Sequence, residues 1–68
     1  MELSEAQKTL IQLLKILKIQ ENQIIATMLA LQKEHQQEEL IYYIKENQDN
    51  IDNRKISKKV TELIKKEN

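Results

Sequence analysis

Three glutamates flank the only histidine of the chain, and these residue types could in principle bind a transition metal. His35 follows Glu34 and precedes Glu38 and Glu39, so on a helix the ring would lie one turn from the last two carboxylates. Di-iron bundles use the order Glu-x-x-His from facing helices, together with further glutamates. Here the histidine comes first. We therefore interpret these residues as the solvated start of a helix and expect no metal.

The segment 47–53 is rich in Asn and Asp, whose side chains supply oxygen ligands to calcium. An EF-hand loop needs oxygen ligands at positions one, three and five, glycine at six and glutamate at twelve. Counted from Asp49, positions three, six and twelve hold Ile51, Arg54 and Val60. Calcium binding through this motif is excluded. The segment is interpreted as a loop, because Asn and Asp hydrogen-bond their own backbone.

Residues for other kinds of catalysis are scarce. Nucleophilic catalysis needs a nucleophile, a base beside it and a group that orients the base, but the sequence has one histidine, no cysteine and few hydroxyl groups. It also has no glycine, which excludes the phosphate-binding loops of nucleotide-binding proteins. We expect a protein that is not an enzyme, without a cofactor and without a small-molecule substrate.

Charge is uneven along the chain, although its net value is zero. The segments 1–33, 34–53 and 54–68 carry +1, −5 and +4. The cations of the last segment could contact nucleic acid phosphates, but a solvated helix face explains them as well. A helix-turn-helix is disfavoured, because its reading helix, 38–46, would carry three glutamates against one lysine. The candidate nucleic-acid contacts of this alternative are Arg54, Lys55, Lys58, Lys59, Lys65 and Lys66.

The elements that would position these residues are helices. Glycine and proline are both absent, and apolar side chains recur at helical spacing. Ser4 and Gln7 form the pattern of a capping box at the first helix. The 68 residues have room for a single helical domain, 1–68. The sequence predicts an all-α fold, a compact bundle of four short helices near 4–18, 22–33, 37–47 and 53–66.

Two boundaries depend on polar residues alone. The run 33–39 lacks an apolar side chain, which predicts a polar turn and then the first turn of the third helix, with Glu38 and Glu39 near its positive end. Asp52 or Asn53 is the expected cap of the last helix.

The division between the first two helices is weak, because nothing in 20–23 forbids helix. Five apolar residues recur every seven positions across it: Leu3, Leu10, Leu17, Ile24 and Leu31. This repeat permits an alternative fold, in which the first two helices are continuous and form a long helix in a dimeric bundle.

Apolar side chains exceed what one small core can cover. Core stripes are predicted from Ala6, Leu10, Leu13, Leu14, Leu17, Ile24, Met28, Leu31, Leu40, Tyr43, Ile44, Ile56, Val60, Leu63 and Ile64. A chain of this size buries only about 60% of its unfolded surface, and association with a partner can cover the remainder. Ile19 is one of the apolar residues outside the stripes. The candidate partner interface consists of Ile11, Ile16, Ile25, Leu29 and Tyr42.

The leading functional hypothesis is therefore a non-catalytic protein–protein interaction module. Its partner is expected to be a second copy, giving a homodimer, or another protein. The start of the chain is acidic, and the most apolar stretch, 24–31, is far shorter than the about twenty residues that span a bilayer. We expect a cytoplasmic protein with no membrane partner.

Overall fold

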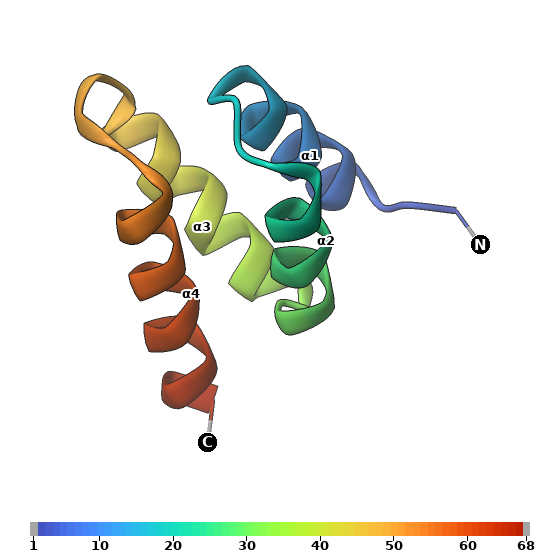
Figure 1. The fold of residues 1–68 in the computed structure, drawn as a ribbon. Coiled ribbons are helices and arrows are strands. Elements are labelled where there is room, and N and C mark those ends of the chain that lie inside the picture. Colours follow the sequence, from blue (N-terminus) through green and yellow to red (C-terminus); the bar gives the residue numbers. More distant parts are fainter. Residues whose placement is uncertain (1, 68) are drawn as a thin grey trace.

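The computed structural model describes residues 2–67, which form α-helices and one short 3-10 helix and contain no strand (Figure 1). The predicted all-α class with four short helices is confirmed. Helix α3 lies between α1 and α4 and contacts both, while α2 contacts α1 and α4. The elements are α1 (Glu5–Ile16), α2 (Glu21–Ala30), α3 (Glu34–Glu46), η1 (Gln48–Asn50) and α4 (Asn53–Glu67).

The helix starts that the sequence predicts from local side chains are confirmed. The Ser4 amide donates to Gln7 Oε1 at 2.8 Å, and the Gln7 amide donates to Ser4 Oγ at 3.2 Å. This reciprocal pair is the capping box of α1. Asp52 is the residue that caps α4, because its Oδ1 accepts a hydrogen bond from the Lys55 amide at 3.0 Å.

A left-handed residue separates α1 from α2. Lys18 has a φ of 61°, and its amide donates to the Lys15 carbonyl at 2.9 Å. The next amide, that of Ile19, donates to the Leu14 carbonyl at 3.0 Å. These two bonds form a Schellman motif, which satisfies the last carbonyls of a helix and ends it. The alternative of one continuous helix is therefore wrong. The turn also places Ile19, expected outside the core, inside it with 8% exposure.

Replacing Lys18 with glycine is expected to stabilise the fold by about 0.5–1 kcal/mol, because a side chain with a Cβ pays a steric penalty at positive φ that glycine avoids. Thermal unfolding should show a midpoint a few degrees higher. Lys58→Gly is the matched control, since Lys58 is exposed within α4. There the same change should cost about 1 kcal/mol. If both substitutions changed the free energy of unfolding in the same direction, the left-handed conformation of Lys18 would be contradicted.

Helix α3 begins earlier than the polar run predicts. It starts at Glu34, which is the acidic residue of its first turn. Glu38 and Glu39, expected near the N-terminus, lie beyond that turn, where the helix dipole acts weakly. The prediction of a polar turn up to the start of a helix at 37 is therefore wrong.

Two glutamines of this run are buried instead of solvated. Gln36 is 5% exposed and Gln37 is 2% exposed. Gln37 Nε2 donates to the Leu31 carbonyl at 2.7 Å, just beyond the end of α2. Gln36 Oε1 accepts a hydrogen bond from the Lys33 amide at 3.3 Å. Gln37 thus joins α3 to the end of α2, whereas Gln36 caps the start of α3 itself.

The core is made from the predicted apolar stripes of the helices, except for Ala6, which lines a surface hollow, and with Ile19 added by the turn after α1. Leu13, Leu17, Met28, Tyr43 and Ile64 pack against it and stay partly exposed. The buried members are Leu10, Leu14, Ile19, Ile24, Leu31, Leu40, Ile44, Ile56, Val60 and Leu63.

Candidate protein interface

A groove between α1 and α2 brings together three of the five residues that we predict to face a partner. Ile11 contributes from α1, and Ile25 and Leu29 contribute from α2. The groove encloses about 320 Å³. Ile25 is 51% exposed and Leu29 is 67% exposed, whereas Ile11 packs partly against the core. The groove therefore has a floor continuous with the core and a rim of exposed aliphatic side chains.

Other residues of the groove were not predicted as interface. Leu3, which precedes α1, is 47% exposed and lines it. Met28 was expected in the core alone, but it is only partly buried and also lines the groove. An unbranched thioether adapts to both surroundings. Helical spacing could not have identified Leu3, because it lies before the N-cap residue Ser4 and outside the helix.

The polar lining residues of this groove are few. Gln7 and Lys15 come from α1, and Glu21 comes from α2. Lys15 lies in the last turn of α1 and Glu21 in the first turn of α2. Both charged side chains are exposed. The groove thus carries one cation and one anion, which belong to opposite walls.

The structure does not bring the other two predicted interface residues to the groove. Ile16 is 73% exposed, but it follows Ile11 by five residues and so points about 140° away around α1. Tyr42 is 69% exposed and lies on α3, beside a second hollow formed with Glu5, Ala6 and Thr9 of α1. The surplus of apolar residues in the sequence therefore did not identify which of them share a surface.

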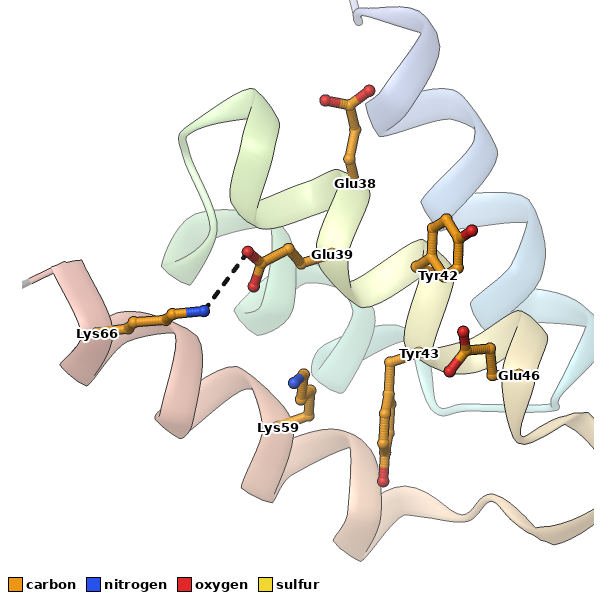
Figure 2. A pocket seen from close by; sticks show the side chains of 7 residues that line it. All are labelled: Glu38, Glu39, Tyr42, Tyr43, Glu46, Lys59 and Lys66. Atoms are coloured by element: carbon orange, nitrogen blue, oxygen red, sulfur yellow. Dashed lines mark ion pairs between the residues drawn. The ribbon is translucent and has the colours of Figure 1, made fainter.

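Figure 2 shows a further hollow, between α3 and α4, in which charged and aromatic side chains meet. Lys66 Nζ lies 3.8 Å from Glu39 Oε1, and Lys59 Nζ lies 5.4 Å from the centroid of the Tyr43 ring. Both partners of the ion pair are exposed, and such a pair contributes only about 0–1 kcal/mol. These contacts join α4 to α3 at the surface, and they bring no nucleophile and base together.

Three of the six candidate nucleic-acid contacts have partners within the protein. Lys59 and Lys66 make the contacts just described, and Lys55 Nζ donates to the Asn50 carbonyl at 2.6 Å. Acidic side chains of α3 line the same hollow as Lys59 and Lys66, so they would repel a phosphate there. The geometry does not favour nucleic acid. The remaining candidates, exposed on α4, are Arg54, Lys58 and Lys65.

Among the side chains that the structure describes, those of residues 2–66, no group of three or more His, Cys, Asp or Glu is placed to hold a metal ion. His35 lies in the first turn of α3 and is exposed. None of the helices in the described part of the chain combines the length and apolar character needed to cross a bilayer.

Comparison of the chain with known protein families, curated proteins and solved structures gives no match. The choice of function therefore depends on the residues and geometry described above.

Proposed function

We propose that this protein is a non-catalytic interaction module that forms a homodimer through the groove between α1 and α2. The observation that supports the proposal is the exposure of Leu3, Ile25 and Leu29 around one continuous groove. Scattered exposed aliphatic side chains are normal on a surface, whereas a contiguous apolar patch indicates a binding site. Here the exposed side chains adjoin one another and the core.

The energetics of burial agree with such an interface. Burying one aliphatic side chain fully is worth about 1.5–3 kcal/mol. A standard interface covers about 800 Å² on each partner, which is about a sixth of the 5153 Å² accessible surface of this chain. Association also stabilises the fold by mass action, which matters for a chain this small. The groove and its rim can therefore form the centre of a dimer interface.

A second copy is a suitable occupant for two reasons. The chain has zero net charge, so two copies do not repel each other over long distances. In a two-fold dimer the same patch supplies both sides of the interface. Each exposed aliphatic residue of the patch is therefore buried in both copies.

Replacing Leu29 with lysine is expected to weaken the dimer. The change places a charge in the groove and should raise the dissociation constant at least about thirtyfold, equivalent to about 2 kcal/mol. Sedimentation velocity over a range of micromolar concentrations measures it. The wild-type chain should sediment as a dimer under the conditions in which Leu29→Lys sediments as a monomer.

Ile16→Lys is the matched control. Ile16 and Leu29 are both exposed and both lie near the end of a helix, where an added cation is favourable. Both variants should therefore retain the circular dichroism spectrum of the wild type, and Ile16→Lys should remain a dimer. A monomeric wild-type chain, or equal weakening by the two variants, would overturn the proposal.

A further inference from the structure

We infer that the surface around Tyr42 binds an arginine-bearing segment of another protein. The inference concerns an exposed aromatic residue that has no place in the groove between α1 and α2. It goes beyond the proposed dimer and does not depend on it, because the residues of this surface and those of the groove are different.

Tyr42 is shared by two hollows on the surface of α3. It lines the hollow that α3 forms with α4 and also the one that α3 forms with α1. Ala6 and Ile41, both partly buried, line the second hollow and give it an apolar floor. Tyr42 itself is 69% exposed. A partner can therefore cover its ring and fill the space beside it.

Carboxylates surround Tyr42. Glu38 and Glu46 lie one turn before and one turn after it on α3 (Figure 2). Glu5 and Glu34 line the hollow against α1 together with Glu38. All four glutamates are exposed, and with the other described residues they form no ion pair. Like charges one turn apart destabilise a helix, so a cation from outside would relieve this repulsion.

The side of α3 that faces α4 shows how the same residue types bind a cation (Figure 2). There Lys59 Nζ lies 5.4 Å from the centroid of the Tyr43 ring, within the range of about 6 Å over which a ring attracts a cation. Lys66 Nζ lies 3.8 Å from Glu39 Oε1. Tyr42 and its glutamates repeat this chemistry, but no cation of the described residues lies over the Tyr42 ring.

Charge complementarity therefore selects a cationic partner, and arginine suits the surface best. Its planar guanidinium stacks on an aromatic ring and carries several N–H donors for carboxylates, whereas lysine ends in a compact ammonium. Tyrosine and arginine are both enriched at protein interfaces. This chain has a single arginine, Arg54, so a second copy would present one guanidinium at most. The partner is therefore another protein.

A hexa-arginine peptide is the probe for this surface. Glu38 and Glu46 are about 12 Å apart along α3, and six extended residues span up to about 20 Å, so one peptide can contact both. Titration at low ionic strength, followed by ¹H–¹⁵N NMR, should shift the amide signals around Tyr42 more than those of α2. Added salt should weaken binding, because exposed charges are screened. Hexa-lysine should bind about threefold more weakly.

Variants separate this surface from general attraction between charges. Glu38→Gln combined with Glu46→Gln removes the carboxylates beside Tyr42 and should raise the dissociation constant of hexa-arginine about tenfold. Tyr42→Leu keeps an apolar side chain but loses the ring, and should raise it about threefold. The matched control is Asp49→Asn combined with Glu62→Gln. It changes the net charge equally at exposed residues that line neither hollow, and should bind like the wild type.

The outcomes keep this surface apart from the dimer. Leu29→Lys should bind hexa-arginine like the wild type, whether or not it dimerises. No binding by the wild type, or equal binding by the Glu38→Gln, Glu46→Gln variant and its control, would overturn the inference. Salt-sensitive assemblies larger than a dimer that are lost in this variant would assign the surface to a second copy and would equally overturn it.

Discussion

Replacing Leu40 with alanine is expected to lower the free energy of unfolding by about 2–5 kcal/mol. Leu40 is 0% exposed and lies on α3, the helix that contacts both α1 and α4. Removing its side chain loses buried apolar area and leaves a cavity where these helices meet. Domains are stable by only about 5–15 kcal/mol, and small domains by less than large ones. The variant should therefore be partly unfolded near room temperature.

Urea denaturation followed by far-UV circular dichroism measures this loss. Wild type and variant are compared at the same protein concentration, because dimer formation contributes to the apparent stability. The control is Ile16→Ala, since Ile16 is 73% exposed and lies outside the groove. That change should stay within about 0.5 kcal/mol. If Leu40→Ala were equally mild, the position of α3 at the centre of the core would be wrong.

Leu40 was predictable as a core residue because helical periodicity is a local property. Residues three and four apart share a side of a helix whatever the rest of the chain does. The start of α1 was predictable for the same reason, since Ser4 and Gln7 cap each other within one turn. The cap at Asp52 is equally local. These features need no knowledge of how helices pack.

The end of α1 was harder to predict. A left-handed residue at a helix end is usually glycine, and this chain has none. Lysine at position 18 gives no sign that its φ is positive, and the repeat of apolar residues every seven positions continues across the break. The burial of Ile19 could therefore not be foreseen, because it follows from that one residue.

The sequence allowed us to predict that aliphatic side chains would be exposed, but not which of them share a surface. Ile25 and Leu29 are exposed, and the partner that we expect for them stays a prediction. Ile16 and Tyr42 give the same signal in the sequence, yet they lie on other surfaces. Periodicity orders residues around one helix, but it does not say which sides of two helices adjoin.

The burial of residues in the run 33–39 could not be predicted from composition, because all the side chains of the run are polar. The last carbonyls of a helix lack partners within the helix, and a buried one needs a donor from elsewhere. Gln37 is that donor for Leu31, and it buries its methylene groups at the same time. A composition that predicts a solvated turn can therefore supply a buried link between helices.

Replacing Gln37 with glutamate is consequently expected to be among the most damaging single changes in the chain. At neutral pH it puts a carboxylate, which cannot donate, beside the Leu31 carbonyl that Gln37 Nε2 now contacts at 2.7 Å. A buried charge without a partner costs about 3–5 kcal/mol. Gln37→Leu removes the donor without adding charge and should cost about 1–3 kcal/mol. Urea denaturation at neutral pH measures both variants.

The effect should depend on burial and not on the loss of a glutamine amide as such. Gln32 provides the comparison, because its Nε2 also donates to a backbone carbonyl, that of Leu29, at 3.1 Å, but in an exposed position. Water can replace that bond, so Gln32→Glu should change the free energy of unfolding by less than about 0.5 kcal/mol. If Gln37→Glu were no more harmful than Gln32→Glu, Gln37 would be solvated, and the link between α2 and α3 would not be a buried one.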